Sequence, residues 1–213
     1  MRIEAVVSDF GGVLTTPLIS SFVAFQDVSG IPMESLGEAM QRIAERDGLH
    51  PLYELEKGNV SEAAFLEAIA DELAPAVGHR PEMHRFSEIY FEALEPNPPM
   101  FELMRELKAD GYRMALLTNN VREWEPLWRS MLPVDEVFEL VVDSAFVRCR
   151  KPDPEIYEIT LQQLGLAAES CLFVDDVEAN CDGARALGIE AVHFRDNEQA
   201  IPEIRERLST AVS

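Results

Sequence analysis

Near its start the chain reads Glu4-Ala-Val-Val-Ser-Asp9-Phe-Gly11-Gly12-Val-Leu-Thr15-Thr16-Pro17. The apolar run before Asp9 predicts a buried strand, and the two glycines that follow allow the backbone to turn sharply. Ligands of open parallel sheets bind outside the carboxyl ends of the strands. The acid is therefore placed for chemistry, although an Asp that only begins a solvent-exposed turn is the structural alternative.

Composition limits the classes of partner. The chain has 213 residues with 47% hydrophobic content, enough for a core and a modest second lobe. Its 39 acids against 18 Lys and Arg give a net charge of −21, which repels nucleic acid and anionic membranes. We therefore expect neither as a partner. A phosphorylated substrate would need local cations to reverse this field.

The cysteines and the apolar runs suggest a compartment. Cys149, Cys171 and Cys181 are few, odd in number and without CxxC spacing, so we expect neither a disulfide framework nor a zinc site. No secretory h-region and no apolar run of about 18 residues is present. We expect a cytoplasmic protein.

Residues 17–95 differ from what surrounds them, because they show helical periodicity with little strand signal. Helices are predicted after Pro32 with a stop at Gly48, after Ser61 as N-cap, and around Phe86 to Ala93. This pattern predicts an inserted helical lobe. Its exit is the proline-rich segment 95–99, where helix and ladder pairing are disfavoured.

From residue 96 onward, helix and strand signals alternate. Helices are predicted over 99–109, 123–132, 153–164, 178–187 and 199–208, and strands over 112–117, 138–142, 171–174 and 189–194. Gly111, Gly165 and Gly188 mark the ends of three of the helices. Such alternation predicts an α/β fold with a parallel sheet sandwiched between helices.

Four motifs occur in a fixed order along the chain: Asp9-Phe-Gly-Gly-Val-Leu, Leu116-Leu-Thr-Asn-Asn120, Arg150-Lys-Pro-Asp-Pro-Glu-Ile-Tyr157 and Phe173-Val-Asp-Asp176. With them the chain resembles the haloacid dehalogenase-like superfamily of hydrolases. It looks most similar to small sugar-phosphate phosphatases and to the amino-terminal phosphatase domain of soluble epoxide hydrolases. The resemblance implies a Rossmann-like core of residues 1–16 and 96–213 with strand order 3-2-1-4-5, and an all-helical cap of residues 17–95.

That strand order would bring Asp9 next to Asp175 and Asp176. Carboxylates that converge in a low dielectric repel one another, so they take up protons or hold a cation. An all-oxygen site favours Mg²⁺. By resemblance the ligands would be Asp9, the main-chain oxygen of Gly11 and Asp176, whereas an N-cap pair is the structural alternative for the two adjacent acids.

The resemblance also implies the remaining roles. Asp9 would be the nucleophile that forms an aspartyl-phosphate, and Lys151 the cation that offsets the phosphoryl charge. Thr118 and Asn119 would bind the phosphoryl group. Asp175 and Asn180 would support the site. Taken alone, a Thr-Asn-Asn turn is an ordinary loop and a lysine in a proline-rich turn is an ordinary surface residue.

Gly11 departs from the pattern of this superfamily, in which most phosphatases carry a second Asp two residues after the nucleophile. Losing a positioned acid or base typically lowers the rate by about 10²–10⁴-fold. Three readings follow: a phosphatase of small phosphorylated metabolites such as sugar phosphates, an inert metal- and phosphate-binding module, and a metal-independent dehalogenase. The sequence leaves the oligomeric state open.

Overall fold

The computed structural model describes residues 2–210 and contains one five-stranded parallel sheet in the order β3-β2-β1-β4-β5. This confirms the predicted fold class and strand order. All four strand segments predicted after residue 96 are present, with ends shifted by at most two residues. The strands are β1 (Ala5–Ser8), β2 (Arg113–Thr118), β3 (Leu140–Asp143), β4 (Cys171–Asp175) and β5 (Glu190–His193).

The sheet is covered on both faces, as side chains alternate along each strand. Val6 belongs to one buried cluster, while its neighbours Ala5 and Val7 belong to the other. Both clusters are apolar because a parallel sheet with two covered faces has no solvent side. The central position of β1 puts Asp9 in the middle of the sheet edge.

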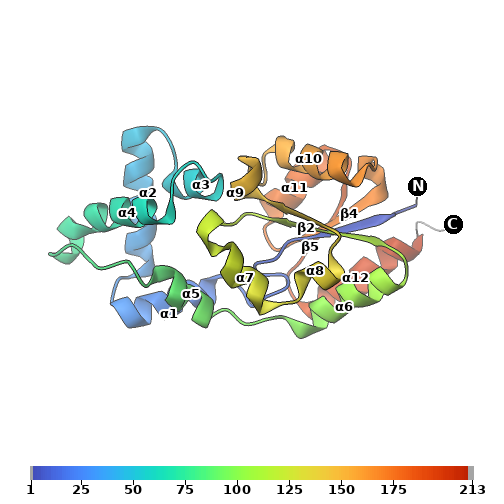
Figure 1. Cartoon of the computed structure of the whole chain (residues 1–213), viewed down its shortest axis with the longest axis horizontal. Coiled ribbons are helices and arrows are strands. Elements are labelled where there is room, and N and C mark those ends of the chain that lie inside the picture. Colours follow the sequence, from blue (N-terminus) through green and yellow to red (C-terminus); the bar gives the residue numbers. More distant parts are fainter. Residues whose placement is uncertain (1, 211–213) are drawn as a thin grey trace.

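The long helices of the core follow the strands. Helices α10 and α11 lie on one face, and α6 and α12 lie together on the other (Figure 1). Helix α6 includes Pro98 and Pro99, because a proline in the first turn needs no hydrogen-bond donor. The core helices are α6 (Pro98–Ala109), α7 (Glu125–Met131), α8 (Val134–Val137), α9 (Ser144–Val147), α10 (Pro154–Leu164), α11 (Glu178–Ala186) and α12 (Asn197–Thr210), of which the short α8 and α9 were not predicted.

Five helices precede α6 and form a lobe beside the carboxyl edge of the sheet (Figure 1). Three were predicted, and the Ser61 hydroxyl accepts the Ala64 N–H at 3.2 Å as an N-cap. Helices α1 and α3 were not assigned from the sequence. The five are α1 (Ile19–Ser29), α2 (Met33–Asp47), α3 (Pro51–Glu56), α4 (Glu62–Val77) and α5 (Phe86–Glu92).

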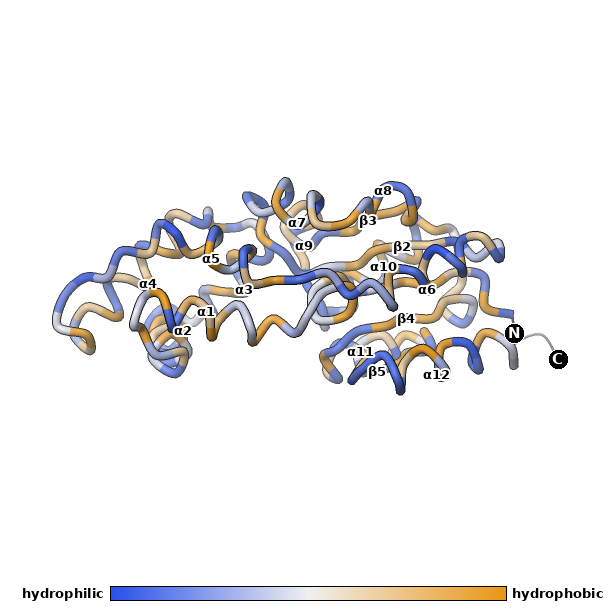
Figure 2. Tube along the Cα trace, turned by 90° about the horizontal axis from the view of Figure 1, so that it is seen from below, coloured by the Kyte–Doolittle hydropathy of each residue, from blue (hydrophilic) through white to orange (hydrophobic). Residues whose placement is uncertain are grey.

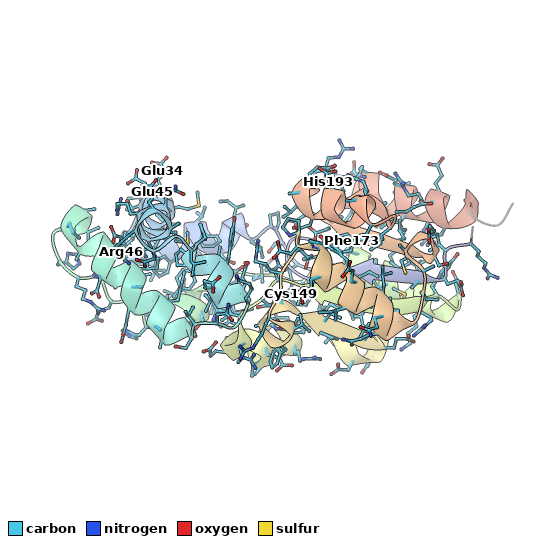
Figure 3. The ribbon with its side chains drawn as sticks, turned by 90° about the horizontal axis from the view of Figure 1, so that it is seen from above. Glu34, Glu45, Arg46, Cys149, Phe173 and His193 are labelled. Carbon is cyan, nitrogen blue, oxygen red and sulfur yellow. The ribbon has the colours of Figure 1, made fainter. Side chains whose placement is uncertain are left out.

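Helices α2 to α5 of the lobe are amphipathic, because their buried residues recur at three- and four-residue spacing. Figure 2 shows hydrophobic and hydrophilic segments alternating along them, which is the pattern of helices with one buried side. Glu34, Glu45 and Arg46 of α2 lie in this lobe, whereas Phe173 and His193 lie in the part that contains the sheet (Figure 3). None of the helices within residues 2–210 is long and apolar enough to cross a bilayer.

The two chain segments that connect the lobe to the sheet run side by side. Thr15 and Pro96 form an antiparallel bridge, the Thr16 N–H donates to the Glu95 carbonyl at 2.7 Å, and the Asn97 N–H donates to the Leu14 carbonyl at 2.8 Å. The division into 1–16 with 96–213 and an inserted 17–95 remains a prediction. These hydrogen bonds lie at its two boundaries.

Candidate active site

Three carboxylates meet where β1 and β4 end. Asp9, Asp175 and Asp176 each offer an oxygen, and the three oxygens lie within 4.8 Å of one another. Asp9 and Asp175 are buried and Asp176 is half-buried. The register that pairs Ser8 with Val174 explains this proximity, because both strands end at the same level of the sheet.

Lys151 supplies the positive charge for this cluster. Its Nζ lies 2.8 Å from Asp9 Oδ1 and 2.6 Å from Asp175 Oδ2, and it donates to the Leu117 carbonyl at 2.9 Å. The residue is fully buried, so a lysine in a proline-rich turn is here an interior group. Phe173 lies beneath it, with its ring centroid 5.5 Å from Nζ.

The protonation of these groups follows from burial and charge. Burial raises the pKa of Asp9 well above its ordinary value despite the attraction of Lys151, and the charges of Asp175 and Asp176 raise it further. Burial and the Asp175 charge raise the pKa of Asp176 to about 6. Burial alone would lower the pKa of Lys151, but Asp175 and Asp9 reverse this and raise it. The three carboxyl groups thus face a single lysine, and a second cation bound between them would offset the remaining negative charge.

Asp9 uses only one of its carboxylate oxygens within the protein. Oδ1 accepts the Phe10 N–H at 2.7 Å and contacts Lys151. Oδ2 takes no hydrogen bond from any residue within 2–210, and Asp9 lines a cavity. One oxygen is therefore held in place while the other keeps its lone pairs free on a residue that lines the cavity, which is what a nucleophilic carboxylate requires.

The structure holds Asp175 and Lys151 in place through amide side chains. Asn180 Nδ2 donates to both Asp175 oxygens, at 3.0 and 3.1 Å. Asn119 accepts the Lys151 N–H at 2.8 Å and donates to the Lys151 carbonyl at 2.9 Å. Asn119 was predicted to bind substrate, and these bonds give it a second role as a clamp on the lysine backbone. Thr118 ends β2 beside them and also lines the cavity.

Two glycines shape the site. Gly12 has φ +78°, and a Cβ there would lie 2.2 Å from Asp176 Oδ2, so only glycine fits the backbone beside that acid. At Gly11 a Cβ would lie 2.9 Å from Leu18 Cδ2. Among residues 2–210, the side-chain atoms nearest to this position are thus those of the apolar Leu18, and not those of a carboxylate.

A cavity of about 470 Å³ opens onto these groups. Most of its polar lining comes from the sheet edge and includes Asp9, Thr118, Lys151 and Asp176, whereas most of its apolar lining comes from the lobe. Several lining residues carry no signal in the sequence. They include Glu56 and Tyr90, which reach the site only because the lobe packs against the sheet edge.

The donor set fits a divalent cation. Asp9 and Asp176 offer carboxylate oxygens, and the cluster of three acids retains excess negative charge beside its single lysine. Hard oxygen ligands of this kind suit Mg²⁺. His193 is the nearby imidazole, and its Nε2 lies 3.0 Å from the main-chain oxygen of Asp176, outside the carboxylate set.

Residues 3–188 match the profile of the haloacid dehalogenase-like hydrolases. The chain is 27% identical to pig (Sus scrofa) bifunctional epoxide hydrolase 2 over 97% of its own length but only 39% of that protein's. It therefore spans about two-fifths of that relative.

Two relatives match along most of both chains. The sesquiterpene phosphatase astK of Aspergillus oryzae is 28% identical over 95% of each chain. The phosphorylated carbohydrates phosphatase of Thermotoga maritima is 29% identical over 89% of this chain and 84% of its own.

Among solved structures, the magnesium complex of the HAD family enzyme BT-2542 from Bacteroides thetaiotaomicron superposes with a TM-score of 0.73. The two chains are 23% identical, over 96% of this chain and all of that chain. At this identity the superposition shows that the folds are alike and nothing more. Sheet order, ordered motifs and profile agree, and the chain belongs to the haloacid dehalogenase-like hydrolases.

Proposed function

We propose that this chain is a magnesium-dependent phosphatase that hydrolyses small phosphate monoesters through an aspartyl-phosphate on Asp9. The observation that carries the proposal is the Asp9 carboxylate, which lines the cavity and has Oδ1 held by Lys151 and the Phe10 N–H, with Oδ2 free of such contacts within residues 2–210. Two relatives whose names describe phosphatases support it. The acidic composition and the free, buried cysteines make a cytoplasmic location without nucleic-acid partners part of the same proposal.

In the first step Asp9 Oδ2 attacks phosphorus, and the bond from phosphorus to the ester oxygen breaks. The electron pair stays with that oxygen, which takes up a proton from solvent water and leaves as the alcohol. Thr118, at the end of β2, would donate its hydroxyl to the transferring group, and Lys151 would offset its charge while keeping Asp9 Oδ1 in place.

In the second step water attacks the phosphorus of the aspartyl-phosphate, which releases inorganic phosphate and restores Asp9. Asp9, Asp176 and the main-chain oxygen of Gly11 would hold Mg²⁺, which when bound offsets the charge of the phosphoryl group. Gly11 has no side chain that could supply a proton, and the space beside it is filled by the apolar side chain of Leu18. Esters with good leaving groups should therefore react fastest.

The test is release of p-nitrophenol from p-nitrophenyl phosphate with Mg²⁺ and after chelation. We expect turnover that requires the metal and that falls to less than about a hundredth in Asp9→Asn, because a carboxamide of nearly the same size is a poor nucleophile. Mg²⁺ should also raise the melting temperature of the wild type, and this gain should disappear in Asp176→Asn. The matched control is Asp182→Asn, which removes an exposed acid that does not line the cavity.

The alternatives give different results. Magnesium stabilisation without any phosphate release indicates an inert binding module. Chloride release from 2-chloropropionate that is independent of metal indicates a dehalogenase. Retention of more than about a hundredth of the activity in Asp9→Asn contradicts the covalent route.

A further inference from the structure

The cavity that contains Asp9 has two chemically different halves. Every lining residue between 17 and 95 is apolar except Glu56 and Tyr90. Leu36, Met40 and Ile69 are typical of this wall, and Trp124 and Trp128 extend it on the side of the core. The charged and amide groups of the lining, apart from Glu56, come from the core.

The single charge on the lobe side is neutralised. Glu56 Oε2 lies 2.6 Å from Arg150 Nε, and the Arg150 guanidinium lies 4.0 Å above the ring of Tyr53. Both side chains of the pair are about one-sixth exposed. The pair joins the lobe to the core and leaves the lobe side of the cavity without an uncompensated charge.

A cluster of four aromatic side chains closes the wall between the lobe and the core. The Trp124 ring lies 5.0 Å from that of Tyr90, 5.4 Å from that of Phe91 and 6.1 Å from that of Phe86. Trp124 precedes α7 of the core, and the other three rings belong to α5 of the lobe. These contacts make the apolar wall continuous from the lobe to the edge of the sheet.

The volume shows that this wall is more than ordinary packing. Native interiors have few voids larger than a water molecule, whereas about 470 Å³ is the size of a small-molecule site. A sugar in such a wall would lose water from hydroxyls to which the apolar side chains offer no hydrogen bond, and this opposes binding. An apolar group would gain from the same burial.

We propose, resting on the phosphatase function above, that the substrate is a phosphate monoester of an apolar alcohol, whose hydrocarbon part fills the lobe side of the cavity. The phosphate would sit against Asp9, Thr118 and Lys151, and the hydrocarbon against the wall that includes Met40 and Ile69. This replaces our expectation that sugar phosphates are the preferred substrates. The names of the relatives leave the choice open, because one names carbohydrates and another a sesquiterpene.

The experiment is a chain-length series of n-alkyl phosphates from ethyl to decyl, each kept below its critical micelle concentration. Leaving-group chemistry is nearly constant along the series, so differences report the apolar contact. We expect kcat/KM to rise about two- to fourfold for each methylene until the cavity is full. Glycerol 3-phosphate and a hexose 6-phosphate should react no faster than ethyl phosphate. A flat or falling series, or a preference for the polar esters, would overturn the inference while leaving the phosphatase function intact.

A matched pair of variants places the effect in the cavity. Met40 and Met33 are both half-buried residues of α2, but only Met40 lines the cavity. We expect Met40→Gln to reduce the gain from chain length by about tenfold or more for decyl phosphate, and Met33→Gln to leave it unchanged. Equal losses in both variants would contradict the assignment of this wall to the substrate.

A binding measurement covers the case in which Met40→Gln does not fold. The n-alkanols carry the hydrocarbon without phosphate, so they should inhibit the wild type competitively, with inhibition constants that fall by about two- to fourfold for each methylene. They should also raise its melting temperature. Absence of both effects overturns the inference. Absence of phosphate release from every ester, together with stabilisation by alkanols, refutes the phosphatase function instead.

Discussion

Replacing Lys151 by Met would remove the one cation that lies among three carboxylates. Each contact is close: Nζ is 2.8 Å from Asp9 and 2.6 Å from Asp175. At an effective dielectric constant of about 20, each is worth about 6 kcal/mol before desolvation is subtracted. Because all three side chains are at least nine-tenths buried, we expect a net loss of about 3–5 kcal/mol in the free energy of unfolding.

The loss should depend on pH. Burial already raises the pKa of Asp9, and loss of the Lys151 charge raises it further, so the folded variant binds more protons than the unfolded chain and loses stability as pH increases. Urea unfolding of the metal-free protein at pH 5 and pH 8 measures this, and the loss relative to wild type should be larger at pH 8. The matched control is Lys108→Met, which removes an exposed lysine that donates to the Glu136 carbonyl; we expect a change within about 0.5 kcal/mol.

A double-mutant cycle with Asp175→Asn tests the cause. If the loss arises from unpaired carboxylates, Lys151→Met should cost less in the Asp175→Asn background, with a coupling of about 1–3 kcal/mol. Additive effects would refute the reasoning. A loss below about 1 kcal/mol at pH 8 would also refute it. A loss that small is typical of an exposed ion pair, whereas Lys151 is a buried cation in contact with two carboxylates.

Two further predictions concern neighbouring positions. Burial raises the pKa of Asp143 from its ordinary value of 3.8 to about 7, so the wild type should lose stability as pH rises between these values. Asp143→Asn should keep the bond to the Ala145 N–H and be more stable than wild type at pH 8, by at most about 4 kcal/mol. Urea unfolding that gives the same difference between variant and wild type at pH 5 and pH 8 would contradict this. Gly12→Ala should lower the free energy of unfolding by more than about 1 kcal/mol, because φ is +78° at this position. It should also abolish stabilisation by Mg²⁺, because the new Cβ would displace the Asp176 carboxylate. An unchanged magnesium-dependent shift in melting temperature would show that Asp176 is not displaced.

Local signals in the sequence predicted most of the fold. The run before Asp9 and the strands that follow residue 96 are short, apolar and bounded by turn residues, and all of them are present. Gly48 and Gly165 end their helices in the left-handed conformation. Such signals act within a few residues, so they are readable without the tertiary structure.

Helices α1 and α3 of the lobe were not predicted, because their local signals are weak. Helix α1 contains Ile19, Val23 and Val28, which are apolar but 51%, 45% and 61% exposed. Its hydrophobic residues therefore do not mark one buried face, and the periodicity that identifies a helix is blurred. The short helix α3 lies below the length over which periodicity can be measured.

The sequence alone determined which residue types the site contains, because the four motifs place Asp9, Thr118, Lys151 and Asp176 after predicted strands or before a predicted helix. Only the tertiary structure decided that Lys151 is fully buried, that Leu18 fills the space beside Gly11, and that the wall facing the site is apolar. These properties depend on contacts between segments far apart in the chain. Spacing fixes what one element presents, but the partner that it meets is set by how the lobe packs against the sheet.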